Sequence, residues 1–339
     1  MNTKLKLLAL SASVLAGFAA APAHAYVYGQ SSLLIDALAI NISPLSGADI
    51  TNFTFTNTNT AFLNGAGGAT QATCSGADGA PGPGTNNCNA SQPRLNPLAM
   101  NAPGGDAGAT RGNLDFSFKG PAGGLQFSNS ASAIDQSTLT GDAFGTWTRQ
   151  IAESELQTGS SASASSQIQS ITGFMFTFTT IAPGSLSLSF SANPDQYSEI
   201  NELLNGLFSA QSNMSVSFTL QQNGGPQFAT WSPSGTAAND CIAVGGLTCS
   251  ETNDQENLNA PIGTTTNHTI AQASHNGAVF SLFGINISGL TAGTFSLTLA
   301  ATTSTQLSRT PVPVPEPGVL LLLGTALTAL GLSRRRQKQ

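Results

Sequence analysis

The sequence contains very little charge. Charged residues make up 8% of its 339 positions, about a third of the usual share. The stretch 26–310 has five Lys or Arg against sixteen Asp or Glu, a net charge of −11, whereas the whole chain has −6. Such an acidic stretch offers no basic patch for phosphates, so we expect no nucleic acid among the partners.

Groups suited to catalysis are scarce as well. Of the three His residues, His268 and His275 lie beyond the N-terminal leader described below, and neither belongs to an HExxH motif. No GxSxG or P-loop pattern occurs. General acid–base chemistry needs one titratable group beside another. The neighbouring acidic pairs are Glu153 with Glu155, Glu199 with Glu202, and Asp254 with Glu256. We therefore expect a protein that is not an enzyme and uses no cofactor or metal.

Residues 1–25 are typical of a secretory signal peptide. Lys4 and Lys6 precede an apolar stretch, and Ala23 and Ala25 form the small-x-small site that signal peptidase needs. The mature chain is then expected to begin at Tyr26. The alternative, a buried N-terminal helix, does not explain why the charged start, the apolar middle and the cleavage site occur together.

The C-terminal residues 311–339 combine three features in order. Alternating prolines over 311–317 favour a stiff, extended segment. Residues 319–332, VLLLLGTALTALGL, carry no charge, and Arg334, Arg335 and Arg336 follow them. A helix over 318–333 would be somewhat short for a hydrocarbon core of roughly 30 Å, but snorkelling arginines accommodate that. We expect a single transmembrane helix with its arginines in the cytoplasm. A core helix would show an amphipathic stripe instead.

This C-terminus resembles the PEP-CTERM sorting signal of Gram-negative bacteria. The resemblance covers about the last 25 residues and includes all three parts of the signal. It implies that Pro315, Glu316 and Pro317 are recognised by exosortase, a membrane-embedded processing enzyme. It also implies that Arg334 to Arg336 are retention charges. The protein would be exported, held at the inner membrane through its C-terminal helix, and then delivered to the cell surface or the extracellular space.

The body 26–310 also resembles other exosortase-dependent surface proteins. Trp231, Pro233 and Gly235 match their Trp-x-Pro-x-Gly turn. The resemblance implies a structural or adhesive protein of the cell surface or of a biofilm matrix, with extracellular polysaccharide as a partner. The alternative is a secreted module that binds or cleaves polysaccharide. Such a module needs aromatic platforms for sugar rings, and the chain has only two Trp and three Tyr.

The body is predicted to consist of β-strands. Large apolar residues alternate with Ser or Thr, as expected for strands with one buried and one hydrated face. Gly-rich turns separate the strands, so we expect an all-β antiparallel sandwich or jelly-roll. The alternating stretches are 53–56, 114–118, 174–178, 186–190, 214–220, 280–282 and 295–299.

One short helix is expected within the body. Asn193 is a good N-cap, Pro194 suits the first helical position, and Gln196 suits the capping box. One apolar stripe at helical spacing follows. The stripe consists of Tyr197, Ile200, Leu203, Leu204, Leu207 and Phe208. In contrast, the Gly- and Pro-rich segment 64–113 has few large apolar residues and is expected to be a surface excursion.

Four Cys in an exported chain favour disulfides. We prefer the local pairing, Cys74 with Cys88 and Cys241 with Cys249, because both pairs lie in polar, Gly-rich loops. A Cys₄ zinc site is the alternative, but the spacings do not match its usual ligand pairs.

Three acids follow Cys249: Glu251, Asp254 and Glu256. They could hold Ca²⁺, although the spacing of an EF-hand is absent. We favour a solvated acidic loop.

Overall fold

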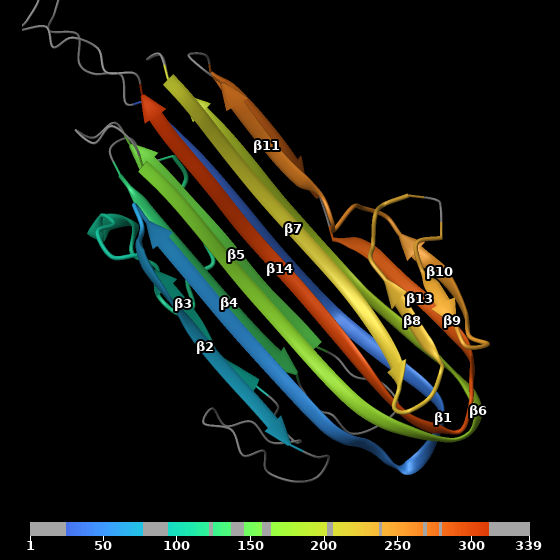
Figure 1. The fold of residues 1–339 in the computed structure, drawn as a ribbon. Helices are drawn as coiled ribbons and strands as arrows, with labels where there is room; N and C mark the ends of the chain where they lie inside the picture. The colour runs from blue at the N-terminus through green and yellow to red at the C-terminus, as the bar shows by residue number, and fades with distance from the viewer. Residues whose placement is uncertain are drawn as a thin grey trace, which may run out of the picture.

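The computed structural model describes residues 25–76, 94–121, 125–136, 146–157, 164–201, 206–236, 239–266, 270–277 and 280–311 (Figure 1). Within these residues the chain forms an antiparallel β-structure with one short 3₁₀ turn at Ala107–Ala109 and no α-helix. The strands are β1 Tyr26–Leu63, β2 Ala66–Gly76, β3 Arg94–Asn101, β4 Phe127–Gln136, β5 Thr146–Gln157, β6 Ala164–Asn201, β7 Gly206–Gln222, β8 Phe228–Trp231, β9 Ile242–Val244, β10 Thr248–Asp254, β11 Pro261–Thr266, β12 Ala271–Asn276, β13 Ser281–Leu290 and β14 Gly293–Pro311.

Two very long strands, β1 and β6, create the two layers of the fold. Each has 38 residues and bends near its middle, where the register between them shifts (Figure 1). Residues 26–43 of β1 pair with 185–201 of β6, and residues 52–63 pair with 166–177. One layer therefore contains β2, the second half of β1, the first half of β6, β14, β7, β8 and β9, with β11 beside β7. The other contains β3, β4, β5, the first half of β1, the second half of β6, β12, β13 and β10.

The predicted strand alternation is confirmed where it is longest. In β7 every second residue from Phe208 to Leu220 is buried, and its neighbours face outward. The same pattern in β6 and β14 places a set of phenylalanines between the layers. Phe190 and Phe283 stack with ring centroids 4.9 Å apart, and Phe178 stacks on Phe295 at 5.6 Å. The all-β, sandwich-like arrangement follows from burying this apolar side of each strand.

Part of the interior is polar, and it links the two layers directly. Ser154 of β5 lies 2.8 Å from Thr305 of β14, both hydroxyl oxygens being buried. Ser198 of β6 lies 3.0 Å from Ser212 of β7. These short side chains let the layers approach closely, and the hydroxyl pairs satisfy one another away from water.

The predicted helix over 193–208 is wrong. Residues 193–201 complete β6, and residues 206–208 begin β7. Asn193 to Ile200 pair with β1 on one side and mostly with β12 on the other. This long-range pairing outweighs the local capping signals.

Pro194 fits this strand because the neighbouring strand, β12, ends just before the position opposite Pro194. Its carbonyl accepts a hydrogen bond from Gly277 N at 2.9 Å. In an antiparallel strand the N–H of a residue points to the same side as its C=O. The missing N–H of Pro194 therefore faces Gly277, just beyond the end of β12, and not the ladder with β1.

Two further predictions differ from the structure. Residues 114–118 are not a strand but part of an irregular segment over 102–121. Carbonyl groups of this segment are taken by a buried arginine instead of by a neighbouring strand, as described below. The excursion 64–113 also contains sheet: β2 pairs with β1, and β3 pairs with β4.

The predicted signal peptide, except Ala25, and the sorting signal after Pro311 lie outside the described residues. So does the predicted helix 318–333. No helix in the described part of the chain is long and apolar enough to span a membrane.

Candidate functional site

A buried ion pair anchors the segment 102–121 to the sheet. Arg111 Nη2 lies 2.5 Å from Glu153 Oε2, and neither side chain has any exposure to solvent. Glu153 projects from β5, and its Oε1 accepts hydrogen bonds from Tyr28 at 2.6 Å, Lys119 N at 2.8 Å and Gly120 N at 2.9 Å. This carboxylate therefore has four donors.

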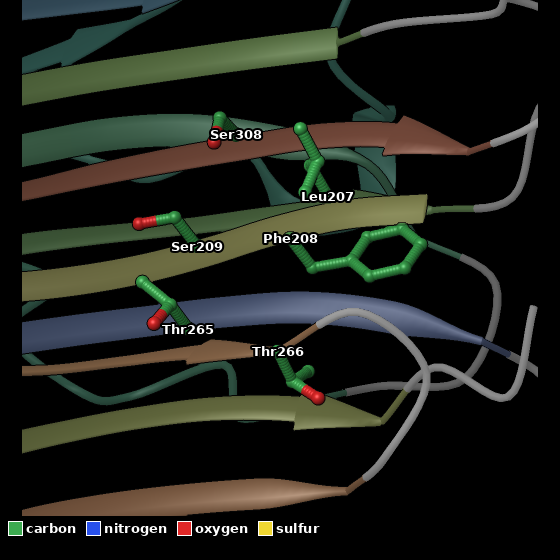
Figure 2. A pocket seen from close by; sticks show the side chains of 6 residues that line it. All are labelled: Leu207, Phe208, Ser209, Thr265, Thr266 and Ser308. Atoms are coloured by element: carbon green, nitrogen blue, oxygen red, sulfur yellow. The ribbon is translucent and has the colours of Figure 1, made fainter. Parts of the chain in front are cut away.

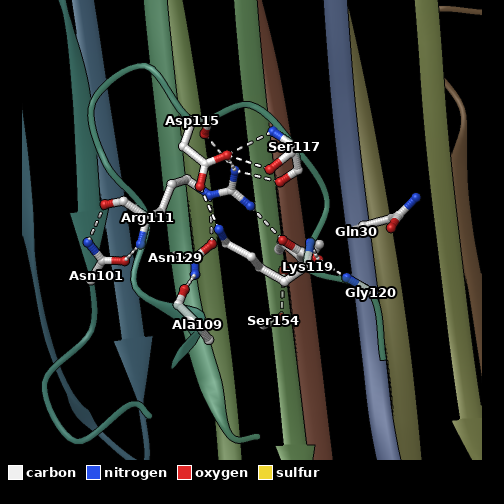
Figure 3. A network of polar contacts seen from close by, with 12 residues as sticks. Gln30, Asn101, Ala109, Arg111, Asp115, Ser117, Lys119, Gly120, Asn129 and Ser154 are labelled. Atoms are coloured by element: carbon white, nitrogen blue, oxygen red, sulfur yellow. Dashed lines mark hydrogen bonds and ion pairs between the residues drawn. The ribbon is translucent and has the colours of Figure 1, made fainter. Parts of the chain in front are cut away.

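Arg111 in turn shapes the segment. Its Nη1 donates to the carbonyls of Asp115 at 2.6 Å and Ser117 at 2.9 Å, and its Nε donates to Asn129 Oδ1 at 2.9 Å (Figure 3). The backbone of 115–117 thus wraps around a guanidinium, which explains why the alternation there does not produce a strand. A fork of planar donors suits this capture of several oxygens.

Burial has opposite effects on the two partners. It raises the pKa of Glu153, and the hydrogen bond from Tyr28 and the Arg111 charge oppose that rise. It lowers the pKa of Arg111, which the Glu153 charge opposes. Tyr28 has its pKa strongly raised by burial and by the neighbouring Glu153 charge, so its phenol stays protonated. Every polar group of this network is engaged, which is typical of a structural role.

Beside this network, strand register brings all three tyrosines of the chain together. Tyr28 of β1 pairs with Glu155 of β5 on one side and Glu199 of β6 on the other. Glu199 pairs in turn with Gln272 of β12. The Tyr28 and Tyr197 rings lie 6.2 Å apart between centroids. Tyr26 adjoins them, because Tyr26 and Tyr28 share one face of β1.

The segment 102–121 covers only half of this arrangement. Tyr28, Glu153 and Glu155 are fully buried, and Phe127 and Ala109 pack against Tyr28. On the other half, side chains reach the solvent. We call this open half the tyrosine surface; it consists of the partly exposed Tyr26, Tyr197 and Asn201, the exposed Gln272, and Glu199, which is 7% exposed.

Glu199 organises the tyrosine surface. Its Oε2 accepts a hydrogen bond from the Tyr197 hydroxyl at 2.9 Å, and its Oε1 accepts one from Gln272 Nε2 at 3.0 Å. The Tyr26 hydroxyl interacts with Glu199 and Asn201. Partial burial raises the pKa of both Tyr26 and Tyr197, and the Glu199 charge adds to the rise. Both phenols are therefore neutral donors at physiological pH.

The Trp-x-Pro-x-Gly motif forms a second, mainly structural cluster at the far end of the sandwich. Trp231 is buried against Phe218, with ring centroids 5.5 Å apart, and donates to Glu251 Oε1 at 2.8 Å. Asp254 Oδ2 accepts hydrogen bonds from Ser234 N at 2.9 Å and Gly235 N at 3.0 Å. Residues 231–235 thus form a turn that acidic side chains hold in place. We call this turn, together with Asp240, Glu251 and Asp254, the acidic turn.

Three carboxylates of the acidic turn are close enough to share a cation. Asp240, Glu251 and Asp254 have oxygens within 4.8 Å of one another. Burial raises the pKa of Glu251 and of Asp254, and the neighbouring carboxylates raise both further. However, each carboxylate already accepts hydrogen bonds from the turn, Asp240 from Ser234 and Thr236. Glu256, grouped with Glu251 and Asp254 by sequence, instead accepts from Ser281 at 2.9 Å and faces His275.

The disulfide prediction is confirmed for Cys241 and Cys249, whose Cα atoms are 5.8 Å apart. Their bond closes the loop beside the acidic turn. Cys74 is also disulfide-bonded, while Cys88 lies outside the described residues. His268 and Glu202 lie outside them too, as do the sorting residues Pro315, Glu316 and Pro317, the arginines Arg334, Arg335 and Arg336, and Ala23 of the signal peptidase site.

A third feature is the outward side of one layer. It is formed by the second half of β1, the first half of β6, β14 and β7, and we call it the neutral face. The residues 52–63, 172–180, 206–222 and 293–310 include one charged residue, Arg309, which is 2% exposed and lies against the Phe208 ring. Outward positions hold mainly Ser, Thr, Asn and Gln.

No pattern in the sequence indicates that the three tyrosines lie together. Tyr26 and Tyr28 lie two residues apart in β1 and so share one face of that strand. The local sequence around Tyr197 predicts a helix, so it does not indicate that Tyr197 lies beside Tyr28 and Tyr26. Only the pairing of β6 with β1 on one side and with β12 on the other places Tyr197, Glu199 and Gln272 beside Tyr26.

No family model matches the chain, and no characterised protein matches it. Among solved structures, the comparison pairs it with the infectious bursal disease virus VP2 subviral particle. The sequence identity is 10% and the TM-score 0.09, over 93% of this chain and 89% of that one. A TM-score this low carries no argument about fold or function. The class of the protein, an all-β antiparallel domain with a sandwich-like arrangement, therefore rests on its own geometry.

Proposed function

We propose that the chain is an exported protein of the cell surface or extracellular matrix with a structural or adhesive role, sorted by its PEP-CTERM-like tail. The observation that carries this proposal is the neutral face. Four adjacent strands present hydroxyl and amide groups to the solvent without an exposed charge. Soluble proteins usually place Lys and Glu on such positions.

A neutral face suits contact with a hydrated polysaccharide. Hydroxyl and amide groups exchange hydrogen bonds with sugar hydroxyls and with bridging water at little cost. Charged side chains would have to lose hydration first, which is costly. Thr298 lies at the centre of this face, between Met175 of β6 and Thr219 of β7.

The positions of the chain ends support the sorting part of the proposal. Tyr26 pairs with Asn201 at the start of β1, and Pro311 pairs with Gly206 at the end of β14. Residues 201 and 206 are close in the sequence, so β1 begins and β14 ends at the same end of the sandwich. A hollow of about 460 Å³ lies there, lined by Leu207, Phe208, Ser209, Thr265, Thr266 and Ser308 (Figure 2). A membrane helix after Pro311 would then hold the body by the same end from which signal peptidase removes the leader.

The test is binding of the processed protein to the host's own extracellular polysaccharide. We expect co-sedimentation without shortening of the polysaccharide chains. The double variant Thr298→Glu/Thr302→Glu, which charges the neutral face, should bind severalfold more weakly. Ser189→Glu, on the outer side of the other layer, serves as the control and should bind normally. The proposal would be contradicted if the polysaccharide were shortened, or if Thr298→Glu/Thr302→Glu bound as tightly as the wild type.

The second candidate is a module that recognises polysaccharide through a defined site. The gathering of Tyr26, Tyr28 and Tyr197 on one face favours it, because a sugar site needs aromatic rings. Cleavage is a weaker candidate. Glycoside hydrolysis requires two available carboxyl groups, and Glu153 is fully engaged with Arg111 and three other donors.

A further inference from the structure

We propose that the tyrosine surface is a binding site for a neutral sugar chain, separate from the neutral face. The proposal rests on the association with polysaccharide proposed above and assigns it a specific site. The site consists of Tyr26, Tyr197, Asn201 and Gln272 as contacting residues, with Glu199 as the residue that positions them.

The first argument is the kind of side chain exposed. Sugars present apolar ring faces edged by hydroxyl groups, so they pack on aromatic rings and exchange hydrogen bonds with planar polar groups. Tyr26 and Tyr197 offer partly exposed rings, and Asn201 and Gln272 offer amides beside them. The chain has only three Tyr, and the third, Tyr28, lies buried directly beside Tyr197.

The second argument is rigidity. Tyr197 and Gln272 are both fixed by hydrogen bonds to Glu199, at 2.9 Å and 3.0 Å. Beside them, the Tyr28 ring is held by the hydrogen bond from its hydroxyl to Glu153, and Glu153 is held by Arg111. Rings that are already ordered lose little conformational entropy when a ligand packs on them.

The third argument is charge. Glu199 and the nearby Asp195, which pairs with Ser32 and contacts Gln30, make this region acidic. Of the two cations around the adjoining Tyr28–Glu153 pair, Arg111 is buried, and Lys119 forms an ion pair with Asp115 at 2.5 Å. An anionic polysaccharide would meet carboxylates without compensating cations, whereas a neutral chain would meet acceptors for its hydroxyl groups.

The experiment uses the processed protein with cellohexaose as a neutral probe and hexagalacturonate as its anionic counterpart, measured by titration calorimetry. We expect cellohexaose to bind and hexagalacturonate to bind at least tenfold more weakly. Tyr197→Ala should weaken cellohexaose binding about tenfold, because it removes one stacking ring. Glu199→Ala should have a similar effect, and Glu199→Gln, which can still accept from Tyr197, should restore most of the affinity.

Two controls separate this proposal from the proposed function. Thr298→Glu/Thr302→Glu should leave cellohexaose binding unchanged, since these residues lie on the opposite layer. Thermal unfolding of Tyr197→Ala shows whether the variant is folded, and saturation-transfer NMR on the wild type and on Tyr197→Ala reports whether contact between sugar protons and the protein depends on this ring. Wild-type protein that fails to bind cellohexaose, or binding unaffected by Tyr197→Ala and Glu199→Ala, overturns the site. If the protein still co-sediments with polysaccharide, and Thr298→Glu/Thr302→Glu weakens this binding, the proposed function stands although the tyrosine surface is not a sugar site.

Discussion

Arg111 and Glu153 form an ion pair of 2.5 Å in which both side chains are wholly buried. The pair joins an irregular segment to the outer side of β5, and it also fixes Tyr28 beside the tyrosine surface. A buried pair of this kind costs desolvation, so it is not by itself a large source of stability. Losing one partner, however, leaves the other charge without compensation in a site that water cannot reach.

Arg111→Met should therefore lower the free energy of unfolding by about 3–5 kcal/mol. The double variant Arg111→Met/Glu153→Gln should cost less than Arg111→Met alone, because no unpaired charge remains. Urea unfolding followed by circular dichroism measures both. Arg149→Met is the matched control: Arg149 is exposed, lies over the Trp147 ring at 5.6 Å, and should cost about 1 kcal/mol or less. Equal losses for Arg111→Met and Arg149→Met would show that the buried pair has no special role.

An ion pair within the same segment, Asp115 with Lys119, predicts that stability depends on pH. Asp115 is held by Lys119 at 2.5 Å and by Ser117, and these hydrogen bonds, with the Arg111 charge, outweigh partial burial and lower its pKa from 3.8 to about 2. A carboxyl group whose pKa is lowered by folding stabilises the fold above its unfolded pKa. That contribution disappears as the pH falls from about 4 to about 2.

We expect wild-type protein to be about 1 kcal/mol more stable than Asp115→Asn at pH 6, since the group is partly exposed and solvent screens it. The difference should vanish near pH 2. Urea unfolding of both proteins between pH 6 and pH 2 gives this difference directly and cancels the titration of other groups. Lys119→Met should shift the loss to higher pH; a difference that stays constant with pH would contradict the assignment.

Much of the fold could be predicted from local pattern. The alternation in Met214 to Leu220 and Phe295 to Leu299 depends only on which side of a strand faces the core, so it survives any change of topology. Residues 114–118 show the same alternation, yet no strand forms there. The reason is Arg111, whose hydrogen bonds take the carbonyls of Asp115 and Ser117.

The candidate site was less accessible to sequence reasoning because it depends on register. Asn193, Pro194 and Gln196 satisfy every local rule for a helix start, but two neighbouring strands offer that segment a full set of backbone partners. In a helix over this segment, Glu199 would lie off the apolar stripe, on the solvent side. The structure instead places Glu199 between two tyrosines and Gln272, which no local pattern encodes.

The acidic turn supports a prediction about Gly235. Its φ is +70°, and an added Cβ would lie 2.6 Å from Asn257 N and 2.7 Å from the Glu256 carbonyl carbon. Gly235→Ala would therefore combine backbone strain with a steric clash and should cost about 2 kcal/mol or more.

Two other glycines separate those causes. Gly224 has φ +73° with nothing within 4 Å of an added Cβ, so Gly224→Ala should cost about 1 kcal/mol from strain alone. Gly112 has open space and no positive φ, and Gly112→Ala should be close to neutral. Thermal unfolding of the three variants should rank Gly235 first and Gly112 last; a different order would refute the steric explanation of the motif.

The last prediction concerns the tail. If the PEP-CTERM-like segment holds the protein at the inner membrane until it is processed near Pro315 to Pro317, deleting residues 315–339 should release the body in soluble form. Because β14 ends at Pro311, this deletion leaves every described strand complete, so loss of anchoring should not be confused with unfolding. Replacing Arg334, Arg335 and Arg336 with Gln provides a second variant, which should weaken retention while keeping the motif. Cell fractionation and mass spectrometry of the C-terminal peptide measure both effects. An intact tail on surface-exposed protein, with identical fractionation of full-length and truncated chains, would rule out this route of sorting.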